Sequence, residues 1–268
     1  MLSKPFIQTG AFVRAHALGA GHTLDLLTRT LLQLPALPRK LRSTLDQMYV
    51  CGVKTLPVTL FVAFFAGLIL SLQTGIELRR FGSEDLVGRV VAASMCREMG
   101  PFMTAIILAA TVGSAMAAEV GTMNVSEEIT ALEVMSIDPA RYIVLPRVVA
   151  LTLMGPILTC FTNIVGILGG GVICDQMLGV SFSSYLSAVH ESLLAPDQLF
   201  PRDIYVGLFK AVVFGMAIAG IGCSSGLRAT EGAIGVGNAV LRAVRNSILM
   251  ILVLGFLVTW FFYSFLQP

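Results

Sequence analysis

The chain has 268 residues, of which 56% are hydrophobic and only 13% are charged. Because soluble domains carry about 25% charged residues, this composition excludes an ordinary soluble globular domain. The net charge of +2 does not single out a partner, and we expect no binding of nucleic acid. The five cysteines form no CxxC pair and no cluster with histidine, so neither a metal site nor a disulfide framework is expected.

Long uncharged stretches predict the fold class, because about 20 apolar residues are needed for one helical crossing of a membrane. These stretches do not alternate as the strands of a membrane barrel do. The sequence therefore predicts an all-α integral membrane protein with five transmembrane helices. The five stretches are 55–76, 99–118, 148–174, 204–227 with Lys210 admitted inside it, and 246–268.

Basic residues are distributed unevenly between the two ends of these spans. With the N-terminus in the cytoplasm, the inner segments 1–54, 119–147 and 228–245 hold twelve Lys and Arg, whereas the outer segments hold four. The positive-inside rule then favours a cytoplasmic N-terminus and a periplasmic C-terminus. The outer segment 175–203 is the long loop, and a short helix is expected there over 181–194, bounded by Pro196 and Pro201.

The region before the first span is expected to form an interfacial helix. We divide the chain into this N-terminal cytoplasmic region, residues 1–53, and a five-span domain, residues 54–268. Asp25 and Arg29 stand at i,i+4 spacing, and leucines recur along one helical face. This helix either lies on the cytoplasmic leaflet or packs against the spans. The recurring leucines are Leu24, Leu27, Leu31 and Leu34.

Three ionisable residues fall inside the predicted spans, where a charge is costly and indicates a functional site. Arg97 and Glu98 lie at the head of the second span, and Lys210 lies within the fourth. Neighbouring residues of a helix do not face each other, so Arg97 and Glu98 are expected to have different partners. These three side chains either line a polar cavity that receives a phosphate, or snorkel or pair for structural reasons.

Residues 124–135 predict a short acidic helix between the second and third spans. Asn124 and Glu127 have capping-box spacing. Asp138 and Pro139 then signal the start of the next helix. Acidic residues on the side where basic residues are expected suggest a partner protein, although a solvated loop helix has the same pattern. The apolar face of this acidic helix is Val125, Ile129 and Leu132.

The chain lacks the sequence motifs of the familiar soluble catalytic sites. It contains no GxxxxGK[ST] phosphate loop, no GxSxG elbow and no HExxH metal motif. We therefore expect no enzyme activity and no cofactor of its own, and any ATPase must be a separate chain.

Several joined motifs resemble the MlaE/YrbE-type ABC permeases of the Mla and Mce lipid-transport systems. They begin with Arg97-Glu98-Met99-Gly100-Pro101 and continue through the run from Gly113 to Met123. The likeness extends from about Lys54 to the C-terminus. The remaining matching motifs are Ala131-Leu132-Glu133-Val134-Met135, Asp138-Pro139, Pro146-Arg147, Gly226-Leu227-Arg228-Ala229 and Gly235-Val236-Gly237.

The resemblance implies a homodimeric permease in the inner membrane that moves phospholipid and supports outer-membrane lipid asymmetry. The implied partners are a cytoplasmic ABC ATPase dimer, a periplasmic MCE-domain carrier and a small STAS-domain regulator. The expected lipid-cavity residues are Arg97, Glu98 and Lys210, joined by Leu68, Leu70, Leu72 and Gln73 of the first span. The expected residues for ATPase coupling are Glu119, Glu127, Glu128, Glu133 and Asp138.

Two other functions fit a charged bundle of this kind. One is a secondary transporter or channel that works without ATP. The other is an intramembrane enzyme such as an acyltransferase, which would need a nucleophile or paired acids at membrane depth. Co-purification with a nucleotide-binding subunit favours the permease, and chemical turnover of lipid by the purified chain favours the enzyme.

Overall fold

The computed structural model describes residues 3–193 and 202–266, with the side chains of residues 18–38, 40–193 and 203–264. Pro196 and Pro201, which were expected to bound the outer helix, lie outside the described residues. Within the described part, five helices are long and apolar enough to cross a membrane, which confirms the predicted fold class. They are Leu41–Arg80, Glu84–Val125, Ala140–Leu178, Asp203–Leu227 and Gly232–Ser264.

The first three of these long helices are built from shorter pieces joined mainly by π-helical turns, whereas the fourth and fifth are continuous α-helices. The second span joins α4, α5 and α6 through the π turns η4 and η5. A π turn admits one residue more than an α-helical turn and is frequent at functional sites. The α-helices are α1 Ser3–Leu32, α2 Leu41–Met48, α3 Leu56–Arg80, α4 Val87–Ser94, α5 Gly100–Leu108, α6 Ser114–Val125, α7 Glu128–Val134, α8 Leu145–Ile173, α9 Phe182–Leu193, α10 Arg202–Leu227 and α11 Gly232–Leu266. The connecting turns are η1 Leu34–Lys40, η2 Tyr49–Val53, η3 Glu84–Leu86, η4 Met95–Met99, η5 Ala109–Gly113, η6 Ala140–Val144 and η7 Cys174–Leu178.

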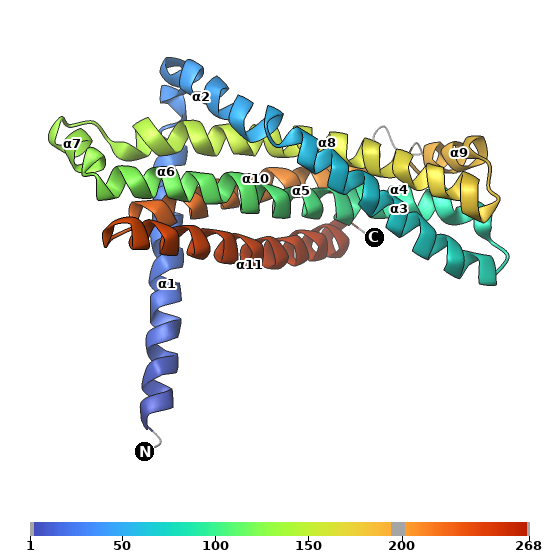
Figure 1. Ribbon diagram of the computed structural model, residues 1–268, viewed down its shortest axis with the longest axis horizontal. Coiled ribbons are helices and arrows are strands. Elements are labelled where there is room, and N and C mark those ends of the chain that lie inside the picture. The colour runs from blue at the N-terminus through green and yellow to red at the C-terminus, as the bar shows by residue number, and fades with distance from the viewer. Residues whose placement is uncertain (1–2, 194–201, 267–268) are drawn as a thin grey trace.

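The long helices lie side by side, with α7 at one end of the bundle and α9 at the other (Figure 1). Helix α8 packs against both α3 and α10. These contacts depend on glycine, because a Cβ placed on Gly67 would lie 1.8 Å from the carbonyl oxygen of Gly166. On the other side, a Cβ on Gly215 would lie 2.5 Å from the carbonyl oxygen of Leu151. Backbones that approach this closely are typical of helix packing in membranes.

Helix α1 runs nearly at right angles to the bundle and crosses it near the end that carries α7 (Figure 1). Leu26 and Thr30 are buried, and Leu27 packs against Gly220 of α10. Leu27 of the predicted leucine stripe thus meets α10, and His22 and Thr23 lie within hydrogen-bond distance of Ser224 on the same helix, while the other leucines of the stripe are exposed. The ion pair between Asp25 and Arg29 is present at 3.0 Å. The exposed leucines are Leu24, Leu31 and Leu34.

The acidic segment departs from its predicted start. Asn124 does not cap a helix, because its side chain donates a hydrogen bond to the carbonyl of Ala229 at 2.9 Å. The capping box is therefore wrong: Glu127 occupies the N-cap position with a φ of 62° and makes no side-chain cap, and α7 begins only at Glu128. Ile129 of the predicted apolar face is buried, whereas Val125 ends α6 and is 37% exposed.

Two smaller predictions are confirmed near the helix ends. Asp138 accepts a hydrogen bond from the backbone N–H of Ala140 at 2.9 Å, so it marks the start of the third span as expected. The expected outer helix is α9, Phe182–Leu193. Its Tyr185 is fully buried and donates a hydrogen bond to the carbonyl of Ile167 at 3.0 Å, which fixes α9 against α8.

Candidate functional site: a charged cluster within the spans

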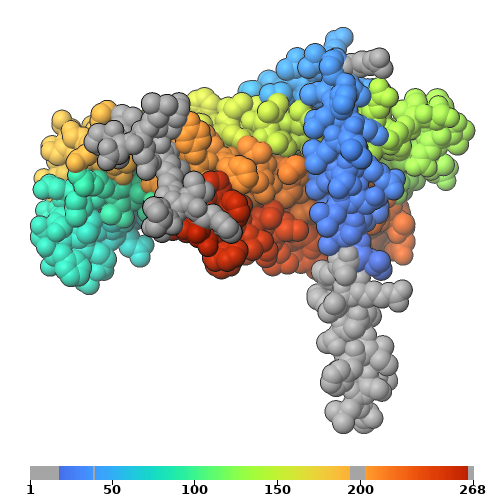
Figure 2. All heavy atoms as spheres, turned by 180° about the vertical axis from the view of Figure 1, so that it is seen from behind, coloured from blue at the N-terminus to red at the C-terminus, as the bar shows by residue number. Residues whose placement is uncertain are grey.

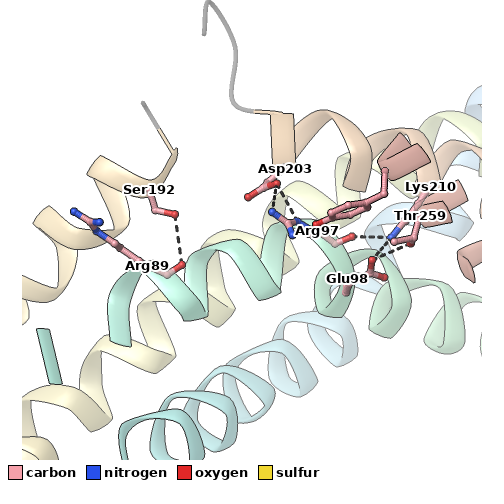
Figure 3. Close-up of polar contacts among 8 residues, drawn as sticks. Arg89, Arg97, Glu98, Ser192, Asp203, Lys210 and Thr259 are labelled. Atoms are coloured by element: carbon pink, nitrogen blue, oxygen red, sulfur yellow. Dashed lines mark hydrogen bonds and ion pairs between the residues drawn. The ribbon is translucent and has the colours of Figure 1, made fainter. Parts of the chain in front are cut away.

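Arg97 and Glu98 of the second span come together with Asp203 and Lys210 of the fourth in one cluster (Figure 3). Arg97 and Glu98 lie in the π turn η4, and Lys210 lies in α10. Seven residues of helix separate Asp203, at the start of the fourth span, from Lys210, so the lysine is about 10 Å inside that span. Lys210 therefore lies within its apolar helix, whereas Asp203 lies at the start of the same helix.

Arg97 points to the outer end of α10. Its Nε and Nη2 donate hydrogen bonds to Oδ1 of Asp203 at 3.0 and 2.7 Å. Its Nη1 donates to the hydroxyl of Tyr263 on α11. The guanidinium is therefore held by an acid from one helix and a phenol from another, which ties η4 to both.

Lys210 points to Glu98. Its Nζ lies 2.5 Å from Oε1 of Glu98 and donates a further hydrogen bond to the carbonyl of Arg97 at 3.1 Å. Thr259 of α11 donates to the same carboxylate oxygen at 3.0 Å. Arg97 and Glu98 thus have different partners, as the sequence predicted.

The cluster is electrically balanced but unevenly buried. Two cations face two carboxylates, so its formal charge is zero. Lys210 is 1% exposed, whereas the side chains of Glu98, Arg97 and Asp203 are 43%, 35% and 21% exposed. A half-exposed ion pair is unfavourable in contact with acyl chains. The open face of the cluster therefore requires water, a polar ligand or another protein surface.

Three members of the cluster were missed by the sequence analysis. Asp203 was counted with the outer loop, although it stands seven residues before Lys210 and hence on the same face of α10. Thr259 and Tyr263 are i,i+4 neighbours on α11, a spacing that is visible in the sequence. Neither residue is charged in its ordinary state, so neither is indicated by the rule that charged residues within spans mark functional sites.

Among the described residues, no hydrogen bond or ion pair joins the expected lipid contacts on α3 to this cluster, although Leu70 packs against the core that contains Met95 and Cys96 of η4. Leu68, Leu70 and Leu72 are half-buried and Gln73 is exposed. Leu70 packs against the apolar core formed by α4 and α9. Leu72 lines a shallow hollow near the outer end of α3, together with Arg79, Arg80 and Met177.

The expected coupling residues separate into two groups. Glu119 belongs to α6 and forms an ion pair with Arg147 of α8 at 2.9 Å, which links two spans. Glu127, Glu128 and Glu133 are exposed on and beside α7. Asp138 is exposed as well and accepts a hydrogen bond from the side chain of Gln33, at the end of α1.

Five apolar crossings, a cluster of ion pairs within them and an exposed acidic helix at one end define a polytopic membrane permease. Comparison with known proteins places it in a family. The model described as Permease MlaE matches residues 44–261, and the chain belongs to the MlaE permease family.

Three relatives illustrate the range of this family. A probable ABC transporter permease protein of Synechocystis is 40% identical over 83% of this chain and 82% of its own length. The chloroplastic protein trigalactosyldiacylglycerol 1 of Arabidopsis thaliana is 38% identical over 83% of this chain and 62% of its own length. The intermembrane phospholipid transport system permease protein MlaE of Haemophilus influenzae is 32% identical over 87% of this chain and 88% of its own length. The chain is therefore a permease subunit of the ABC-transporter type.

Proposed function

We propose that this permease moves phospholipid between the inner membrane and a periplasmic MCE-domain carrier, and so supports outer-membrane lipid asymmetry. The observation that carries the proposal is the half-exposed ion-pair cluster of Glu98 and Lys210 inside the spans. The name of the Haemophilus relative, an intermembrane phospholipid transport permease, supports the choice of cargo.

A lipid phosphate has a clear way to enter the cluster. The phosphate carries the charge of a carboxylate and can replace Glu98 at Lys210, or Asp203 at Arg97, at little electrostatic cost. The acid that is displaced remains at the exposed side of the cluster, where it can be hydrated. In this mechanism the two ion pairs hold the empty site, and lipid binding exchanges one anion for another.

A second copy of the chain is the partner that best encloses the open side of the cluster. Helix α11 carries Thr259 and Tyr263 toward the cluster, and only 11% of the residues in its apolar stretch are buried. Large apolar side chains on the same helix are exposed, among them Phe256 at 70% and Trp260 at 57%. A homodimer packed through this helix would bury them and place two clusters around one chamber.

The proposed energy source is a separate ATPase dimer docked on α7. Val134, 81% exposed, ends this helix and Met135, 61% exposed, follows it, and Glu128 and Glu133 are exposed on the same helix. An apolar tip with an acidic rim fits a groove of a partner that is apolar at its centre and basic at its edge. ATP is then bound and hydrolysed by that partner, and this chain needs no cofactor.

The remaining assignments follow from the proposed orientation. The N-terminus and α7 lie in the cytoplasm, and α9 faces the periplasm together with the MCE-domain carrier. A small STAS-domain regulator would act through the ATPase. Glu119, which pairs with Arg147 of α8, and Asp138, which bonds Gln33, are proposed to take part in the same coupling by joining the region of α7 to other helices.

Transfer of a fluorescent phospholipid tests this function. Proteoliposomes that hold the permease and its ATPase are mixed with the carrier, and movement of the lipid is followed with ATP and with a non-hydrolysable analogue. We expect transfer only with ATP. Equal transfer without ATP would identify a secondary transporter, and chemically altered lipid would identify an enzyme.

A further inference from the structure

A groove at the other end of α10 has no part in the proposed transport site. It lies where α1 crosses α10 and α11, and α1 lies across these two helices in Figure 2. Its volume is about 520 Å³, which is within the range of sites for small ligands. Arg228 lines it and stands eighteen residues from Lys210, so these two cationic residues are about 27 Å apart along the helix.

The groove is polar at one end and apolar along the rest. Arg228 and Ser225 line its polar end, and the apolar walls continue along α10 as far as Val213. These fifteen residues of helix span about 22 Å, more than half the thickness of the hydrocarbon core. The groove therefore extends from the level of the headgroups into the hydrocarbon. The other apolar wall consists of Leu249, Met250, Val253 and Leu254 of α11.

The polar end carries positive charge without a matching acid. Nε of Arg228 donates to the carbonyl of Ser224 at 3.1 Å, and its terminal nitrogens lie against Gly19 of α1. Burial and the nearby charge of Arg242 both lower the pKa of Arg228. Among the described residues, no carboxylate pairs with either arginine. Arg242 does not line the groove, but its charge adds to that of Arg228, and a guanidinium group without an acid favours an anion.

Unsatisfied polar atoms at the same place also indicate a ligand. Ser225 is 1% exposed, and its hydroxyl has no hydrogen-bond partner. The buried side-chain oxygen of Asn246, which lines the groove from α11, has none either. Buried polar atoms are nearly always hydrogen-bonded, so two free ones in the groove that Arg228 lines call for a ligand with donors and acceptors. A phospholipid supplies both, because its ester oxygens accept hydrogen bonds and the hydroxyls of a glycerol headgroup donate them.

We propose that this groove binds one anionic glycerophospholipid, with its phosphate at Arg228, its headgroup hydroxyls and ester oxygens at Ser225 and Asn246, and one acyl chain along α10 and α11. In the proposed orientation this lipid belongs to the cytoplasmic leaflet. It holds α1 against the bundle and is distinct from the transported lipid. The site does not depend on the proposed function, because it contains none of the charged residues of the central cluster.

Lipid binding to the purified full-length chain tests the proposal. Native mass spectrometry with phosphatidylglycerol and with phosphatidylcholine measures the affinity for each, in a Lys210→Ala background that weakens the central site. We expect Arg228→Gln to weaken phosphatidylglycerol binding about tenfold, since one charge-assisted contact is lost, and to weaken phosphatidylcholine binding less, since its choline cation already offsets the phosphate charge. Arg245→Gln is the matched control, because Arg245 is exposed and does not line the groove. Arg228→Lys should retain most of the affinity.

A second variant and a labelled lipid locate the site. Ala217 lines the groove, so Ala217→Trp should fill it and remove binding of both lipids there. Phosphatidylglycerol with a photoreactive acyl chain should label peptides that contain Met216 and Met250. Equal affinities of Arg228→Gln and Arg245→Gln, or labelling confined to other helices, would overturn the proposal. Crosslinks from the groove to a second copy, with lipid binding unchanged by Ala217→Trp, would assign the groove to a protein contact instead.

Discussion

Lys210 and Glu98 are joined at 2.5 Å, yet the lysine is 1% exposed and the glutamate is 43% exposed. The two partners therefore differ in what each loses when the other is removed. Without Glu98, the ammonium group keeps only the carbonyl of Arg97 in a buried place. Without Lys210, the carboxylate keeps the hydroxyl of Thr259 and its open side.

This asymmetry predicts unequal losses of stability. Glu98→Gln should lower the free energy of unfolding by about 3 kcal/mol, because it leaves a buried charge without an acid. Lys210→Met should cost about 1 kcal/mol, since the exposed carboxylate remains hydrated. Thermal unfolding in detergent measures both, and the double variant should be more stable than Glu98→Gln alone. A larger loss for Lys210→Met would contradict the arrangement of the pair.

Lipid loading should depend on the same cluster. We expect Arg97→Ala, Glu98→Ala and Lys210→Ala to lower the amount of phospholipid that co-purifies with the assembled complex severalfold, because each removes or unbalances an ion pair at the site. Quantitative lipid mass spectrometry gives the amount, and size-exclusion chromatography confirms assembly. Lys54→Ala, at an exposed residue outside the cluster, is the control. Full lipid occupancy in all three variants would refute the role of the cluster.

Reversing the charge of α7 should uncouple the ATPase. Glu128→Lys combined with Glu133→Lys is expected to reduce lipid-stimulated ATP hydrolysis about tenfold, because like charges then meet the basic edge of the proposed partner. Glu77→Lys is the control, since Glu77 is exposed at the opposite end of the bundle. Unchanged coupling in the α7 variant would leave that helix without its proposed role.

The contact between α3 and α8 predicts that alanine is far more destabilising at Gly67, in that contact, than at Gly21 of α1. Gly67→Ala should prevent correct packing and lower the free energy of unfolding by at least about 2 kcal/mol, because its Cβ would overlap the carbonyl of Gly166. Gly21→Ala in α1 has nothing within 4 Å of its Cβ and should be neutral or slightly stabilising. Expression level and thermal unfolding distinguish the two, and equal behaviour would contradict the close approach.

Acidification should loosen α1. Burial and the charge of Arg228 hold the pKa of His22 below its usual value, and its Nδ1 lies 3.0 Å from the hydroxyl of Ser224. A proton is therefore bound more readily when α1 is undocked, so undocking is favoured as pH falls through the ordinary histidine range, near 6.5. Protease accessibility of α1 should rise between about pH 7 and pH 5, and His22→Gln should abolish that change. If His22→Gln keeps the pH profile of the unmodified chain, protonation of His22 is not the cause of the loosening of α1.

The spans and the ion-pair residues were predictable because uncharged runs and charges inside them are properties of the sequence alone. Asp203 was not recognised, since it borders a loop and becomes part of the site only when α10 packs beside η4. The capping box failed for a similar reason: Asn124 has suitable spacing, but the carbonyl of Ala229, 105 residues away, takes its hydrogen bond. The stripe of leucines on α1 included Leu27, which meets α10, but it could not show that His22 and Thr23 lie against Ser224 of that helix.

The π turn Met95–Met99 sets the rotational phase between the two halves of the second span. Its extra residue turns everything on the α4 side by about 100° relative to a continuous α-helix. Arg89 faces Glu191 of α9 on one side of this turn, while Arg97 and Glu98 face α10 and α11 within it. Loss of a single residue here would leave the hydropathy of the span intact. The ion pair of Arg89 with Glu191 and the contacts of Arg97 and Glu98 could then no longer form at the same time.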